Sequence, residues 1–212
     1  MTKNLFISAL AMLLSISFLP LLAQTGDNAI VKEVRKVSGF TSIRMEGVGS
    51  IVFTQSSNYN FQIEGPAVNI KKYAVSVEGK ELVITQENEQ NKKNNKQKVT
   101  FYISAPDLSK VIIEGVGNFS APNTLSLKNL VFKLEGVGNF STKDLKCDVF
   151  QADLEGVGNM DLRVDCQRIK VNLEGVGNMT LSGRADKVHT VKEGTGKIDI
   201  KNLTYRELNN KE

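Results

Sequence analysis

The sequence predicts an all-β fold: a single-stranded right-handed parallel β-helix (a β-solenoid) with rungs of about 20 residues, Gly-x-Gly-Asn corners and an N-terminal β region. Three observations lead to this prediction. A pentapeptide recurs at a nearly fixed interval, the residues on either side of it alternate between apolar and polar, and one interval is too short for two helices with their connections.

The pentapeptide Glu-Gly-Val-Gly-Asn occurs four times, and degenerate copies begin at Glu46 and Glu193. The four full copies begin at Glu114, Glu135, Glu155 and Glu174. From Glu114 to Glu193, each copy begins roughly 20 residues after the one before it. A period of this size is typical of a chain that winds one structural unit on top of the last.

The residues before each glutamate alternate with period two, which indicates a half-buried strand. One, three and five residues before Glu155 stand Leu154, Ala152 and Phe150, with the polar Asp153 and Gln151 between them. A second short strand with the same alternation follows each corner. Its first inward column is expected to hold Phe119, Phe140, Met160, Met179 and Ile198.

Between the two strands, two glycines and an asparagine can adopt positive φ at low cost, so the chain is expected to turn there. Parallel laps would stack about 4.8 Å apart, and equivalent residues would form ladders along the solenoid. The central valines are expected to point inward at this corner: Val48, Val116, Val137, Val157 and Val176. The handedness follows from the right-handed crossover preference of parallel strands.

Residues 1–23 are predicted to be a secretory signal peptide, with Lys3 in the positive region and an apolar run broken by Pro20. The alternative is a retained membrane anchor, but the run is near the lower length limit for spanning. Residues 24–212 then form one exported β-solenoid domain without a membrane span. Export would place it in the periplasm, on the outer-membrane surface or outside the cell.

Residues 51–105 contain further strands without the pentapeptide, two of them expected to join in a hairpin at Glu78-Gly-Lys. Residues 87–98 are nearly all Glu, Gln, Asn and Lys, which predicts a polar loop. Nucleic-acid binding by its lysines is the alternative, but the loop lacks aromatic residues, so no nucleic-acid partner is expected. Without residues 1–23 the net charge falls from +4 to about +3, which indicates no particular partner.

These segments resemble a known family. Residues 37–43 with the first Gly-Val-Gly, the strand pair at 75–84 and residues 105–118 are similar to the autotransporter adhesin head family, also called the GIN domain, found in exported proteins of Bacteroidetes-type bacteria. The resemblance covers roughly residues 37–202. It implies a right-handed β-helix-like fold and an adhesin-like role.

The glutamates follow an inward residue and are expected to form an outward ladder of Glu114, Glu135, Glu155, Glu174 and Glu193. Stacked carboxylates repel one another by roughly 1 kcal/mol per pair in water, so something is expected to offset this. A shared Ca²⁺ is one interpretation. Glutamates that reach into solvent or accept backbone N–H bonds are the favoured one, because the Asp-rich spacing of calcium-binding solenoids is missing.

The asparagines are expected to form a structural corner ladder of Asn118, Asn139, Asn159 and Asn178. Cys147 and Cys166 fall in the same column of adjacent rungs, so they either form a disulfide or stay as buried thiols. His189, the single histidine, has no metal-binding or catalytic partner in its column.

The sequence therefore favours an exported, non-enzymatic cell-envelope protein, an adhesin-like binding or self-associating module. No catalytic residue, metal site or cofactor is predicted, and the partner is unknown: a surface glycan, an envelope protein or a second copy. The alternative is a carbohydrate-active enzyme on a β-helix scaffold. The identical carboxylate in every rung argues against it, because glycosidic catalysis needs two carboxylates in unlike surroundings.

Overall fold

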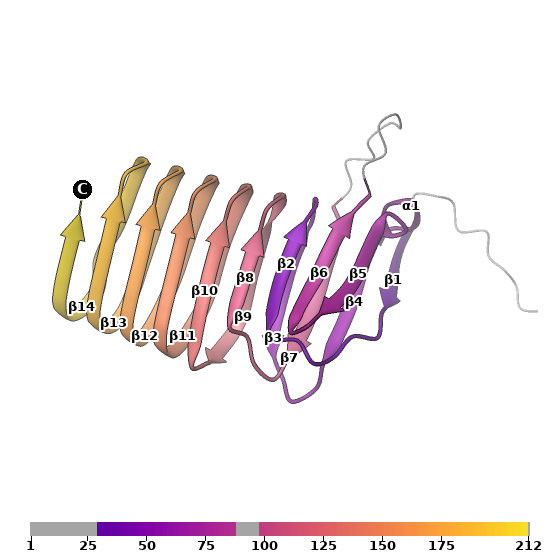
Figure 1. Cartoon of the computed structure of the whole chain (residues 1–212), viewed down its shortest axis with the longest axis horizontal. Helices are drawn as coiled ribbons and strands as arrows, with labels where there is room; N and C mark the ends of the chain where they lie inside the picture. Colours follow the sequence, from indigo (N-terminus) through magenta and orange to yellow (C-terminus); the bar gives the residue numbers. More distant parts are fainter. Residues whose placement is uncertain (1–28, 88–97, 212) are drawn as a thin grey trace, which may run out of the picture.

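The computed structural model describes residues 29–87 and 98–211, and it stacks flattened β-rungs into one elongated solenoid (Figure 1). The predicted signal peptide at 1–23 lies outside the described residues. So do residues 88–97 of the predicted polar loop.

The pentapeptide repeats form the regular half of the solenoid. Each of its last four rungs is one long bent strand: β11 (Val137–Leu154), β12 (Val157–Leu173), β13 (Val176–Lys192) and β14 (Thr195–Lys211). The rung before them is divided into β9 (Val116–Ser126) and β10 (Asn129–Leu134), and β8 (Lys110–Ile113) precedes it. All of these strands pair in parallel, with Gly138 opposite Gly158 and Gly158 opposite Gly177. The predicted all-β parallel solenoid is confirmed.

The core lies between the two faces of the flattened rungs. The alternating apolar columns point into it, and Phe132, Phe150 and Leu154 are fully buried. Phenylalanines from the two faces meet across the interior, where the rings of Phe132 and Phe140 stack with their centroids 4.6 Å apart. Burial of these columns supplies the hydrophobic stabilisation that joins each rung to its neighbours.

The first degenerate pentapeptide belongs to a rung of its own. Strands β2 (Ser42–Glu46) and β3 (Ser50–Gln55) stack directly on β8 and β9. Val48 bridges to Val116 at the corner, although the two are far apart in the sequence. Residues 56–109 are thus an insertion that leaves the stack after one rung and returns to it on the other side.

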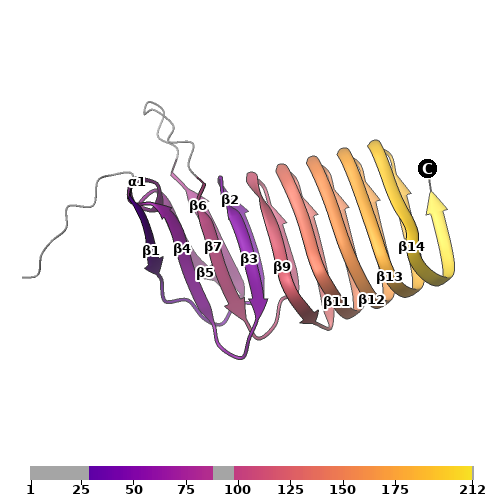
Figure 2. The ribbon, with the colours of Figure 1, turned by 180° about the vertical axis from the view of Figure 1, so that it is seen from behind.

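This insertion covers the N-terminal end of the solenoid (Figure 2). On one face, β6 (Glu81–Gln86) extends the stack in parallel with β2, and β5 (Tyr73–Glu78) pairs with β6 as an antiparallel hairpin. On the other face, β7 (Thr100–Ala105) is parallel to β3, and β4 (Asn60–Pro66) is antiparallel to β7. Strand β1 (Ile30–Val34), which precedes the insertion in the chain, pairs antiparallel with β4. The short helix α1 (Ala67–Ile70) links the two faces. Antiparallel edge strands therefore end the parallel stack here.

The expectation that the central valines point inward is wrong. Val137 and Val157 are each 49% exposed, and the other three valines of the column are similarly exposed. The in–out alternation continues through the corner, so Glu, Val and Asn face outward and the two glycines occupy the intervening positions.

Close backbone approach is the reason that these positions are glycine. A Cβ on Gly138 would lie 1.6 Å from the carbonyl oxygen of Gly117 in the preceding rung, and one on Gly158 would lie 1.6 Å from that of Gly138. No side chain can be accommodated at such distances. Positive φ is not the general cause, because of the corner glycines only Gly177, at 153°, and Gly196, at 137°, have it, and no described asparagine does.

A search of the described residues for a helix long and apolar enough to cross a membrane found none.

Candidate functional site

The corner of each rung presents three parallel columns to solvent. The glutamates, valines and asparagines of successive pentapeptides lie above one another because the rungs are in register. In the regular rungs, residues such as Glu155, Val157 and Asn159 are all exposed. This surface is periodic, and each rung repeats nearly the same set of groups.

Basic side chains partly neutralise the glutamate column. The Nζ of Lys133 lies 2.8 Å from Glu135 Oε1 and 3.1 Å from Glu155 Oε1, so one ammonium serves two adjacent rungs. Both hydrogen bonds raise the pKa of Lys133, and the bond with Glu135 has the larger effect. Within the described ranges, Glu174 and Glu193 form no ion pair.

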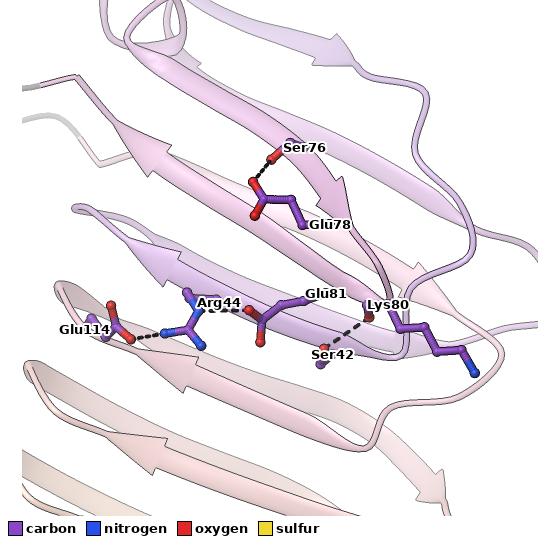
Figure 3. Close-up of polar contacts among 7 residues, drawn as sticks. All are labelled: Ser42, Arg44, Ser76, Glu78, Lys80, Glu81 and Glu114. Carbon is purple, nitrogen blue, oxygen red and sulfur yellow. Dashed lines mark hydrogen bonds and ion pairs between the residues drawn. The ribbon is translucent and has the colours of Figure 1, made fainter.

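An arginine has the same role at the N-terminal end of the column. The guanidinium of Arg44 in β2 lies between Glu81 of β6, at 2.9 Å, and Glu114 beside β8 (Figure 3). The hydrogen bond with Glu81 is the main cause that raises the pKa of Arg44. Three neighbouring strands are thus joined by one cation on the outer face.

The asparagine column is a continuous hydrogen-bonded ladder. Oδ1 of Asn139 accepts hydrogen bonds from the backbone N–H of Asn159 at 3.1 Å and from its Nδ2 at 3.2 Å. The same two bonds join Asn118 with Asn139 and Asn159 with Asn178. The ladder therefore pairs side-chain and backbone groups of successive corners.

Cys147 and Cys166 are opposite one another in adjacent rungs and are both free thiols in the structure. The thiol of Cys166 donates to the carbonyl of Leu145 at 3.8 Å. A hydrogen bond with Cys166, together with burial, raises the pKa of the Cys147 thiol. Both side chains are less than a tenth exposed and line the floor of a groove.

This groove, with a volume of about 870 Å³, is half a lap from the glycine corner. Five successive rungs each contribute three consecutive residues to it: 126–128, 146–148, 165–167, 184–186 and 204–206. The middle residue of each triplet forms the floor, and the two outer residues form opposite walls. The floor residues are Leu127, Cys147, Cys166, Ala185 and Tyr205.

Polar side chains in the walls pair with one another from rung to rung. Arg184 holds Asp165 through two nitrogens, with contacts of 2.9 to 3.2 Å. On the other wall, Gln167 donates to Asp148 at 3.1 Å. Arg206 lies 3.3 Å from Asp186 on that same wall. The groove therefore presents donors and acceptors that are already held in place.

The sequence reasoning missed this groove. It singled out the cysteine column but made no prediction for the polar residues on either side of it. The signal was the pattern polar-apolar-polar around Cys147 and Cys166, with basic and acidic residues mixed along both flanking columns. His189 lies apart from the groove, opposite Lys170 in β12 and Asn209 in β14. Across residues 29–87 and 98–211, no three His, Cys, Asp or Glu side chains are grouped as a metal site would require.

Comparison with known families identifies the chain. A family model described as "Putative auto-transporter adhesin, head GIN domain" matches residues 39–211. The chain belongs to this family. The match covers the capping insertion and every rung of the GIN-domain chain, in agreement with the resemblance found in its motifs.

Solved structures share the fold of this GIN-domain chain. A crystal structure described as a "putative adhesin" from Bacteroides fragilis NCTC 9343 is 21% identical, with a TM-score of 0.65 over 86% of this chain and 95% of that one. One described as a "Putative lipid binding protein" from Parabacteroides distasonis ATCC 8503 is 16% identical, with a TM-score of 0.75 over 86% of this chain and 78% of that one. At these identities the likeness shows the fold alone. A comparison with curated proteins found no match.

Proposed function

We propose that this GIN-domain chain is an exported, non-enzymatic protein of the cell envelope that acts as an adhesin-like binding module. The observation that carries the proposal is the groove, because five rungs contribute equivalent triplets to one continuous surface. A row of similar sites suits an extended partner that is held at many points. The family description, an adhesin head, agrees with this role.

The polar groups of the groove are arranged for binding more than for catalysis. A carboxyl group that acts as a general acid is usually kept protonated by apolar surroundings. Here Asp165 is held by Arg184, Asp148 accepts from Gln167, and Asp186 lies beside Arg206. Each carboxylate is thus already held by a donor from the neighbouring rung. The carbohydrate-active enzyme alternative has no such observation in its favour.

The experiment measures binding of the purified, fluorescently labelled chain to intact bacterial cells. We expect saturable binding and no release of reducing sugar from bacterial or host polysaccharides. Cells treated with protease and cells treated with periodate, which destroys sugar rings, divide the partners into proteins and glycans. Sedimentation of the chain alone measures self-association.

Two results would overturn the proposal. One is the absence of both saturable binding and self-association. The other is release of reducing sugar that disappears when Asp148, Asp165 or Asp186 is changed to Asn while the fold survives. Either result would leave the groove without the role assigned to it here.

A further inference from the structure

We propose that the groove binds a linear polysaccharide of low net charge, extended parallel to the solenoid axis. This inference rests on the proposed binding function and names the ligand class of the same surface. It depends on three properties of the groove: its repeat, its charge balance, and the difference between its floor and its walls.

The repeat of the groove follows the rungs. Lys146, Asp165, Arg184 and Thr204 are opposite one another in successive parallel strands, so one wall offers a polar group at every rung. Five rungs about 4.8 Å apart give a groove of about 19 Å. A pyranose unit in an extended chain is about as long as one rung is high, so successive sugars can meet successive triplets. An extended peptide advances only about 3.3 Å per residue and loses register with the rungs.

The charge balance of the walls excludes a strong preference for polyanions. Four basic residues, Lys128, Lys146, Arg184 and Arg206, face three acidic ones, Asp148, Asp165 and Asp186. Recognition of nucleic acid depends on an excess of cations that replaces counterions. Alternating donors and acceptors are instead suited to hydroxyl groups, each of which both donates and accepts a hydrogen bond.

The floor of the groove is mainly apolar and its walls are polar, and a sugar ring likewise has an apolar C–H face and polar hydroxyl groups. Cys147, Cys166 and Ala185 are apolar members of the buried core and less than a tenth exposed, so the floor has no charged side chain at these three rungs. Tyr205 is 39% exposed at the C-terminal end of the floor, where its ring offers an apolar surface with a polar tip. The C–H face of a sugar can rest on this floor while its hydroxyl groups reach the walls. An acyl chain would be left between two charged walls, whose desolvation is costly.

The test uses linear oligosaccharides of glucose, galactose, mannose and N-acetylglucosamine, from two to eight units, with calorimetry on the full chain. We expect affinity for at least one series to rise with length and to level off at about five units, one for each triplet. Phosphatidylglycerol vesicles and heparin fragments serve as the lipid and polyanion arms, and both should bind more weakly.

Matched variants locate the site. Lys146→Ala in the wall should weaken binding about fivefold, roughly the equivalent of one hydrogen bond. Lys170→Ala is the control, because Lys170 is also an exposed lysine of β12 but does not line the groove and lies opposite Gln151 and His189. Gln167→Ala is a second wall variant, which repeats the test without a change of charge.

The inference is overturned if no series binds with a dependence on length, if vesicles or heparin bind more tightly, or if both lysine variants weaken binding equally. Cell binding that survives periodate but not protease would also overturn it. In that case the proposed binding function would stand and only the ligand class would fall.

Discussion

The side-chain amide of Asn139 donates a 2.8 Å hydrogen bond to Oδ1 of Asn118 in the preceding rung, and the backbone N–H of Asn139 donates to the same oxygen at 3.1 Å. One amide oxygen thus accepts hydrogen bonds from both the backbone and the side chain of the next rung. The next rung repeats the arrangement with Asn139 as the acceptor, so every internal asparagine is bonded on both sides.

Replacing Asn139 with Ala should therefore lower the stability of the chain. The substitution removes hydrogen bonds to two rungs, and we expect a loss of about 1–2 kcal/mol in the free energy of unfolding. Asn129→Ala is the control, since Asn129 is also exposed but lies outside the ladder. Denaturant titration measures both, and an equal loss in the two variants would contradict a stabilising role for the ladder.

Gly138→Ala should be far more damaging than Val137→Ala, the change at the adjacent residue. The alanine Cβ would meet the carbonyl oxygen of Gly117 at 1.6 Å, so the two rungs would have to separate. Val137 is half exposed, and its truncation removes little buried surface. We expect Gly138→Ala to cost several kcal/mol or to prevent folding, and Val137→Ala to cost under about 1 kcal/mol. Comparable melting temperatures for the two variants would refute the close-approach explanation.

Thr142→Val should stabilise the chain. The hydroxyl of Thr142 is buried in the core and, within the described part of the chain, has no hydrogen-bond partner. Valine has nearly the same shape and does not bury an unsatisfied polar group, so we expect a gain of about 1 kcal/mol. Thr190→Val is the control, because the hydroxyl of Thr190 is equally buried but donates to Asn210 at 2.5 Å. The melting temperature should rise for Thr142→Val and fall for Thr190→Val.

Lys133→Gln should weaken the glutamate column by a small amount that depends on salt. The change leaves Glu135 and Glu155 without their shared cation, so the two carboxylates repel each other across adjacent rungs. Because the site is accessible to solvent, we expect a cost below about 1 kcal/mol that disappears in high salt. Lys170→Gln should have no effect. Millimolar Ca²⁺ should not change the melting temperature of the unmodified chain. If calcium raises this temperature and the effect is lost in Glu135→Gln, the glutamates bind a cation instead.

The Cys147 thiol should make stability depend on pH in the alkaline range. Its pKa is raised in the folded chain, so the unfolded chain loses the proton first as the pH rises. The contribution of this thiol to the free energy of unfolding is therefore fully present below the unfolded pKa of about 8.5. It declines as the pH rises above that value. The difference in stability between the unmodified chain and Cys147→Ala should change between pH 8 and pH 10. A constant difference, or a native mass two hydrogens lighter because of a disulfide, would contradict the buried-thiol arrangement.

The apolar columns could be predicted from sequence because alternation is a local property. Leu154 and Phe150 needed no knowledge of distant residues to be placed in the core. The placement of residues 56–109 on the far side of β2 and β3 could not be predicted in this way, because it depends on pairing between strands that are far apart in the sequence.

The orientation of the valines was predicted wrongly because hydrophobicity alone was used to place them. At the corner, approach between backbones leaves space only for glycine at the inward positions, and the valine next to them must face solvent. The groove was missed for another reason. Its polar-apolar-polar triplets are visible in the sequence, but the same alternation occurs along every strand, so the pattern alone does not distinguish a groove from an ordinary outer face.

The contact of glycine with glycine at each corner has an evolutionary consequence. The residues that hold one rung against the next cannot vary, while the triplets half a lap away carry no such restriction. A duplicated rung would therefore keep the residues that stack it, and its recognition residues would be free to drift. Proteins with this fold can therefore change the ligand that they bind, one rung at a time, while their fold stays the same.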